Sequence, residues 1–143
     1  MKKNVVQVEI KSIVPTNAGA AIFVGNDKKS FVIYVEQSMG EIINMFLNNI
    51  HKERPLTHDL MLNIFKGFGI EVMHIIISEL KNSTYYARLY LKQQNELGTK
   101  IVELDARPSD CLAIASGVKC PIFVTASLFE QVDKRPLLRV WLG

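Results

Sequence analysis

The sequence predicts a single α+β domain with a mixed, largely antiparallel sheet and three to four helices. The chain has 143 residues, the size of one ordinary domain with its own hydrophobic core. Its segments of apolar periodicity occur in the order β-β-β-α-α-β-β-β-α-β-α, with strands clustered and helices interspersed. We see no internal repeat, low-complexity segment or linker. Residues 1–143 are therefore expected to form one domain.

Composition limits the classes of function. Hydrophobic residues make up 48% and charged residues 22% of the chain, the balance of a soluble globular protein, which we expect in the cytoplasm. The net charge of +3 is compatible with nucleic acid but lacks the basic stripe that would demand it. No apolar stretch reaches membrane-spanning length. The two cysteines, Cys111 and Cys120, have no CxxC spacing, which argues against zinc and favours reduced thiols.

The N-terminal part alternates and then becomes helical. Val6, Val8 and Ile10 alternate with polar residues, which is typical of a strand with one wet face. The segments "AAIFVG" and "SFVIYV" flank residues 26–29 and predict a hairpin. Ser38 and Glu41 have the spacing of a capping box at the start of a first helix.

A second helix and three strands follow. Thr57 is expected to be the N-cap of the helix, which would end near Gly67 and Gly69. The segments "IEVMHIIISEL", "TYYARLYLK" and "TKIVELD" then predict an antiparallel meander.

The C-terminal part predicts a helix, a strand and a short helix. Pro108 suits the first turn of the helix, and Gly117 suits the position just past its end. "PIFV" is typical of a short buried strand, and "SLFEQV" of one or two further helical turns. The tail from Leu137 to Leu142 is apolar, so we expect it to form a subunit contact in a homodimer or higher homo-oligomer.

Two polar segments carry the residues suited to chemistry. In "DARPSD", Asp105 closes a strand, and Asp110 lies in the first turn of the next helix. Arg107 and Ser109 could bind phosphate beside the helix N-terminus. Asp105 and Asp110 could instead hold Mg²⁺ or Mn²⁺, which prefer oxygen ligands. A well-capped helix with an internal Arg–Asp pair also accounts for this pattern.

The segment "RPLTHD", residues 54–59, repeats that construction. Its Arg54, Thr57 and Asp59 precede or open a helix, and His58 adds an imidazole that suits a metal ligand or general base. Helix capping by Thr57, with His58 exposed, is the alternative. If the two helix starts converge in space, their charged groups would share one cleft.

Other candidates are weaker. His74 lies inside an apolar strand and suits a half-buried position, while Cys111 lies among small residues and suits packing. Tyr86 and Tyr90 share a strand face with Arg88 and Lys92, which could stack bases or pack across strands. The chain has no Walker loop, GxGxxG, GxSxG or HExxH motif.

In combination, "RPLTHDLMLNIFKGFGIEV", "YYARLYL" and "VELDARPSDCLAIASGVKCPIFV" resemble the bifunctional nuclease domain family of bacteria and plants, from about Val5 to Val132. Its plant members are described as acting on both DNA and RNA. The matching positions lie at 54, 55 and 57–59, then at 105 and 107–110; at Cys111 the family more often has a small aliphatic residue. We expect a bacterial member consisting of the core domain alone.

The resemblance implies a nuclease that hydrolyses phosphodiester bonds of DNA or RNA, with Mg²⁺ or Mn²⁺ as its expected cofactor. We predict Asp105, Asp110, His58 and Asp59 as catalytic residues, with Asp105 and Asp110 holding the metal. The predicted substrate-binding residues are Arg54, Thr57, Arg107 and Ser109. The alternatives are a non-catalytic module that binds anions or nucleic acid, and an oligomerisation domain in which the motif residues only stabilise the fold.

Overall fold

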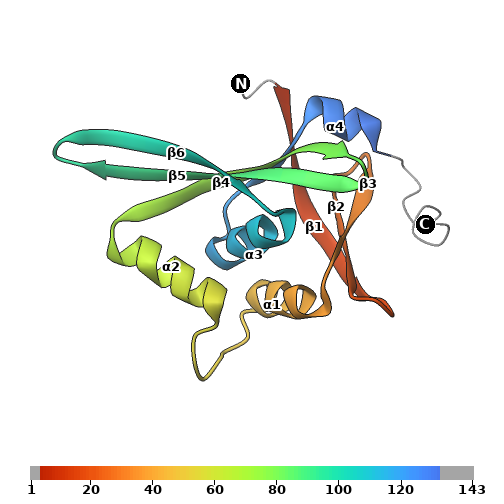
Figure 1. The fold of residues 1–143 in the computed structure, drawn as a ribbon, viewed down its shortest axis with the longest axis horizontal. Helices are drawn as coiled ribbons and strands as arrows, with labels where there is room; N and C mark the ends of the chain where they lie inside the picture. Colours follow the sequence, from red (N-terminus) through yellow and green to blue (C-terminus); the bar gives the residue numbers. More distant parts are fainter. Residues whose placement is uncertain (1–3, 133–143) are drawn as a thin grey trace.

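Among the described residues, seven strands and four helices form in the predicted order (Figure 1). The computed structural model describes residues 4–132. The strands are β1 (Val5–Pro15), β2 (Ala20–Gly25), β3 (Ser30–Val35), β4 (Ile70–Lys81), β5 (Thr84–Asn95), β6 (Gly98–Ala106) and β7 (Ile122–Thr125). The helices are α1 (Gln37–Leu47), α2 (Thr57–Gly67), α3 (Pro108–Val118) and α4 (Ala126–Gln131). The predicted α+β class is confirmed, and the tail from Leu137 to Leu142 lies outside the described residues.

The strands form one mixed sheet in the order β3-β2-β1-β7-β4-β5-β6. Both predicted antiparallel units are confirmed: the β2–β3 hairpin, and the meander of β4, β5 and β6. Only β4 and β7 run parallel within the described sheet. Strand β1 joins the two halves, because its first residues pair with β7 and its later residues pair with β2.

Helix α3 occupies the centre of the core. Every residue from Cys111 to Ser116 is buried, as expected for a helix that is apolar on most sides. It packs against β4 and β5 of the sheet and against α1 and α2. Figure 1 shows α1, α2 and α3 on the same side of the β4–β6 strands, whereas α4 packs apart from them against β1, β4 and β7. The start of α3 therefore lies where the sheet and two helices meet.

Two helix starts differ from the sequence predictions. Helix α1 has Glu36 as its N-cap, so Ser38 lies inside its first turn. Helix α2 has Leu56 as its N-cap, so Thr57 is its first helical residue. The type of side chain predicts roughly where a helix begins but not the exact residue, because neighbouring polar groups can satisfy the same backbone donors.

Gly117 was predicted to follow α3 but lies inside it. The helix continues through Val118, and Lys119 takes the left-handed conformation at its C-cap with φ of 63°. A Cβ atom at Gly117 would lie 2.7 Å from Leu62 Cδ1 and 3.2 Å from Phe46 Cε1. The missing side chain therefore allows α1 and α2 to approach α3 closely.

Within residues 4–132, no helix combines the length and apolar character needed to cross a bilayer.

Candidate functional site

A carboxylate and a lysine hold the start of α2. The Asp59 carboxylate accepts a hydrogen bond from the Leu56 backbone N–H, with an N···O distance of 2.9 Å. The other Asp59 oxygen lies 3.3 Å from Lys52 Nζ. Asp59 thus satisfies a backbone donor at the helix N-terminus, where its negative charge is also favourable. Thr57 is exposed and makes no capping hydrogen bond.

The start of α3 forms as the sequence predicts. Arg107 is its extended N-cap residue, and Pro108 occupies the first helical position, where its missing N–H costs nothing. The Arg107 guanidinium turns back over the first turn to Asp110. Its Nε donates to Asp110 Oδ2 at 3.0 Å, and its Nη2 donates to Asp110 Oδ1 at 3.4 Å. Arg107 stays 63% exposed at its side chain.

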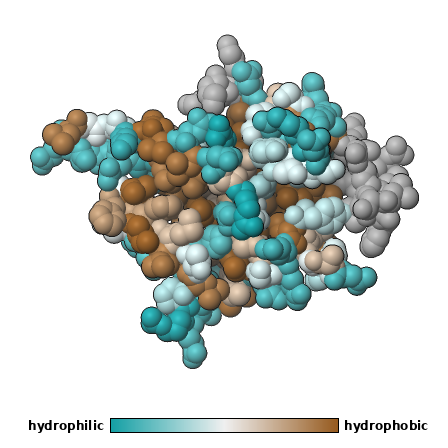
Figure 2. Space-filling model, in the orientation of Figure 1, coloured by the Kyte–Doolittle hydropathy of each residue, from teal (hydrophilic) through white to brown (hydrophobic). Residues whose placement is uncertain are grey.

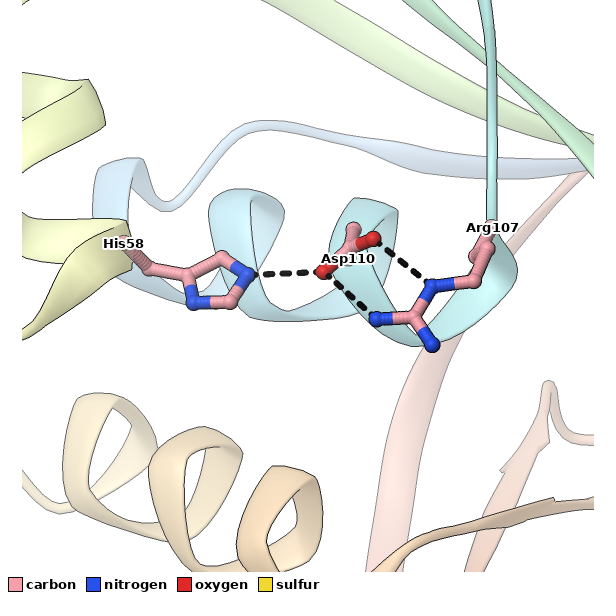
Figure 3. A network of polar contacts seen from close by, with 3 residues as sticks. All are labelled: His58, Arg107 and Asp110. Atoms are coloured by element: carbon pink, nitrogen blue, oxygen red, sulfur yellow. Dashed lines mark hydrogen bonds and ion pairs between the residues drawn. The ribbon is translucent and has the colours of Figure 1, made fainter.

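The two helix starts meet at Asp110 (Figure 3). His58 Nε2 lies 2.8 Å from Asp110 Oδ1, across 52 residues of sequence. An ionised carboxylate can only accept hydrogen bonds, so Nε2 carries the proton and donates it. The predicted convergence of the two motifs is confirmed for His58, Arg107 and Asp110. We call these three residues the motif junction.

His58 is buried, contrary to the exposed position expected for a simple cap. The residue is only 6% exposed. Its Nδ1 atom is also buried and has no hydrogen-bond partner among the described residues. One ring nitrogen therefore serves Asp110, and the other is closed off from solvent in this arrangement.

The charges of the motif junction stabilise one another. Burial alone would raise the pKa of Asp110, but hydrogen bonds from Arg107 and His58, together with their charges, hold that pKa below its usual range. The hydrogen bond and charge of Asp110 raise the pKa of Arg107 in turn. The carboxylate and guanidinium consequently remain a charged pair over the physiological range.

Asp105 lies on the other side of the sheet. In β6, Ala106 packs against the core, and successive strand side chains point to opposite faces, so Asp105 points away from the helices. Its Cα partner on β5 is Arg88, whose guanidinium pairs with Glu103 at 3.4 Å. Asp105 and Asp110 thus bracket the turn into α3 without facing each other.

The remaining predicted residues do not join the motif junction. Arg54 is exposed, and no hydrogen bond or ion pair of its side chain occurs in the described part of the chain. Between residues 4 and 132, no three His, Cys, Asp or Glu side chains are grouped closely enough to hold a metal ion. Burial, followed by the charges of Asp110 and Asp105, raises the pKa of Cys111 to about 12, which keeps it a thiol rather than a nucleophilic thiolate.

A cleft opens beside Arg107. It has a volume of about 340 Å³ and lies between the end of β3, the β4–β5 turn and the start of α3. Arg107 and Ser109 line it, as do hydroxyl residues that sequence reasoning missed: Tyr34, Ser83, Thr84 and Tyr85. Their one signal in the sequence was the break between the predicted strands "IEVMHIIISEL" and "TYYARLYLK", which contains Asn82 and Ser83. Both turn residues have positive φ, 54° and 63°, which is the conformation of a type I′ hairpin turn.

A larger cleft lies elsewhere among the described residues. It measures about 670 Å³ and runs between the C-terminal parts of α2 and α3 and the start of β4. Its lining contains no residue of the polar segments "RPLTHD" and "DARPSD". We place the candidate site at the smaller cleft because that one contains Arg107 and Ser109.

Fold and site together define a class: an α+β domain in which two Arg-Pro helix starts meet through a His–Asp–Arg junction at the edge of one mixed sheet. The chain belongs to the bifunctional nuclease domain family, whose model matches residues 22–136.

Proteins of a bacterium and of plants are similar to parts of the chain. An uncharacterized protein of Mycobacterium tuberculosis is 30% identical over 74% of this chain and 60% of its own length. A protein named bifunctional nuclease 1 from Oryza sativa subsp. indica is 38% identical over 54% of this chain and 23% of its own length. Bifunctional nuclease 2 from Arabidopsis thaliana is 29% identical over 57% of this chain and 25% of its own length. The matches thus span about 60% of the mycobacterial relative and about a quarter of the plant relatives.

Proposed function

We propose that this domain is a nuclease that binds a phosphodiester of DNA or RNA in the cleft beside Arg107 and hydrolyses it. The observation that carries the proposal is the meeting of both family motifs at Asp110, next to a cleft that offers a guanidinium and several hydroxyls. The family, and the plant relatives named as nucleases, support this reaction class.

Arg107 is the proposed phosphate-binding group. A guanidinium has five N–H donors, and Asp110 takes two of them in the structure. The remaining donors are available to a phosphate oxygen, and the exposed side chain can present them without breaking the pair. Ser109 and the positive end of the α3 dipole would add favourable contacts for an anion.

The other predicted catalytic residues take mainly positioning roles in this proposal. Asp110 orients Arg107, His58 orients Asp110, and Asp59 fixes the loop that brings α2 to the site. Arg54 and Thr57 are exposed near the same helix start, so we keep them as contacts for the more distant parts of a nucleic-acid chain.

Metal dependence stays a prediction. Asp105 is exposed, but Asp110 already accepts hydrogen bonds from two side chains and points to the other side. The carboxylates of Asp105 and Asp110 therefore do not fit a metal ion held by protein ligands alone. A hydrated Mg²⁺ usually takes one or two carboxylates and otherwise water and phosphate oxygens. Asp105 points away from the face of the sheet that carries Asp110, so this set of residues places no metal ion at the cleft beside Arg107.

A nuclease assay on purified protein tests the proposal. Labelled DNA and RNA are incubated with Mg²⁺, with Mn²⁺ and with chelator, using wild type, Asp105→Ala and Asp110→Ala. Asp27→Ala, in the remote β2–β3 turn, is the matched control. We expect cleavage that Asp110→Ala strongly reduces and Asp27→Ala leaves unchanged, each variant first being shown to fold by circular dichroism. Cleavage that survives chelator and both site substitutions would indicate a contaminant and remove the proposal.

A non-catalytic binding module is the second candidate. The burial of His58, whose Nδ1 atom is closed off from solvent while Nε2 is held by Asp110, favours it, because this imidazole does not face a substrate. Nucleic-acid binding that is lost with Arg107→Gln, with no cleavage under any metal condition, would select this candidate over the nuclease.

A further inference from the structure

Strand β6 is an open edge of the sheet. It runs for nine residues and pairs only with β5 among the described strands. It contains no proline, which is a common means of blunting an edge. One side of its backbone therefore offers a row of donors and acceptors to another strand.

An apolar surface adjoins this edge. Leu60, Ile64 and Phe68 recur at four-residue spacing along α2 and remain exposed, Phe68 to 71%. Val102 and Leu104 lie on the face of β6 that points toward the helices, and Leu104 is 41% exposed. Figure 2 shows apolar side chains grouped between the β5–β6 strands and α2. We call these five residues the α2–β6 surface.

The two parts of this surface are connected through β5. The side-chain amide of Gln93 donates to the Phe68 carbonyl at 2.9 Å. Gln93 pairs with Lys100 of β6, and Leu91 beside it pairs with Val102. The end of α2 thus lies against the strand next to the open edge, so a partner that pairs with β6 also reaches the α2 stripe.

We propose that a second copy of this chain covers the β6 edge and the α2–β6 surface, forming a two-fold symmetric dimer. A two-fold axis perpendicular to the sheet pairs β6 antiparallel with β6 of the partner and keeps each face of the sheet on the same side. Both α2 helices then lie on one face of a continuous sheet. Such an isologous contact needs only one self-complementary surface.

The sequence of β6 suits this pairing. When the axis passes through Val102, all nine residues pair, from Gly98 opposite Ala106 to Val102 opposite itself. Lys100 then lies opposite Leu104, and Thr99 opposite Asp105, so no like charges face each other. Centring the pair at Glu103 instead would oppose two carboxylates. The favourable register also places Val102 and Leu104 of both copies on the helix side.

The contact extends beyond the strand edge. A stable interface buries roughly 800 Å² per partner, more than an edge strand alone provides. The exposed stripe of α2 adds apolar surface beside the paired strands, and homodimer interfaces are more apolar than the rest of a protein surface.

Sedimentation equilibrium of the full chain tests the dimer. We expect twice the 16.2 kDa mass of one chain. The substitutions Leu104→Glu and Phe68→Glu should each raise the dissociation constant of the dimer at least about tenfold, because each substitution buries an unpaired charge. Val14→Glu is the matched control, since Val14 is similarly exposed at 45% but lies on β1. Amide hydrogen exchange in β6 should slow when the protein concentration rises above the dissociation constant.

Three results would overturn the proposal. The first is a monomer at every concentration tested. The second is a dimer that Val14→Glu weakens as much as Leu104→Glu does. The third is a dimer that keeps its affinity in Leu104→Glu and loses it on removal of residues 133–143, which would assign the contact to the C-terminal tail.

Discussion

At the scale of single residues, the motif junction turns two sequence motifs into one structure. Asp110 accepts from both His58 and Arg107, so its carboxylate links the start of α2 to the start of α3. A buried imidazole held on one side by a carboxylate and closed on the other acts through its neighbour. In the proposed function, His58 is for this reason a positioning residue, while Arg107 is the group that would contact substrate.

Replacement of His58 tests its positioning role. His58→Ala should lower the free energy of unfolding by about 1–3 kcal/mol, since it removes a buried hydrogen bond and leaves a small cavity. His58→Gln, whose amide N–H can still donate to Asp110, should recover part of the loss. Urea unfolding measures both, and equal stability of wild type and His58→Ala would contradict the role.

The pKa of Asp110 predicts how stability depends on pH. Because its folded pKa lies below the usual value near 3.9, the carboxylate contributes stability that is fully present above about pH 4 and is lost as the pH falls through the folded pKa. Wild type should exceed Asp110→Asn in unfolding free energy at neutral pH, and the difference should shrink in acid. Urea titrations at several pH values measure it, and a difference independent of pH would exclude a native carboxylate of lowered pKa.

At the scale of elements, glycines divide into those that allow close packing and those that do not. A Cβ atom at Gly25 would lie 2.2 Å from the Lys29 carbonyl oxygen and 2.5 Å from Ser30 Cα in the β2–β3 hairpin. At Gly67 in α2, no described atom lies within 4 Å of the same position apart from its chain neighbours and the backbone of its own helix. Sequence alone does not separate the two.

Alanine substitutions should separate them. Gly25→Ala should destabilise the protein by about 1–3 kcal/mol, because rigid backbone must move. Gly67→Ala should stabilise it by about 0.5–1 kcal/mol through helix propensity. Thermal unfolding of both variants measures the effects, and similar melting temperatures would contradict the hairpin contact.

The order of the elements follows from the sequence because apolar periodicity is a local property. The segment "VELDA" also indicates which face of the strand carries Asp105. Val102, Leu104 and Ala106 alternate on one face, so Asp105 belongs to the opposite face. The predicted grouping of Asp105 with Asp110 overlooked this signal. The burial of His58 and the place of Gly117 inside α3 were beyond sequence reasoning. Both depend on how α1 and α2 pack against α3, which no local pattern encodes.

At the scale of the whole molecule, the site depends on contacts between distant segments. Helix α3 is held in the core, and its exposed start lies at the rim, where β3, the β4–β5 turn and Arg107 form the cleft. A rigid core that presents polar groups at its edge is the usual arrangement of a functional site. The metal, the catalytic roles and the oligomeric state stay predictions that belong to this scale.

The most direct test of the central claim is single-turnover cleavage of a labelled oligonucleotide by wild type, Arg107→Gln and Arg88→Gln. Arg88 is the matched control because it is also a partly exposed arginine, paired with Glu103 on the opposite face of the sheet. Loss of a donor aimed at the reacting phosphate should slow cleavage by Arg107→Gln about 10²-fold, while Arg88→Gln should cleave at the wild-type rate. Equal rates for wild type and Arg107→Gln would contradict the assignment of the site to the start of α3.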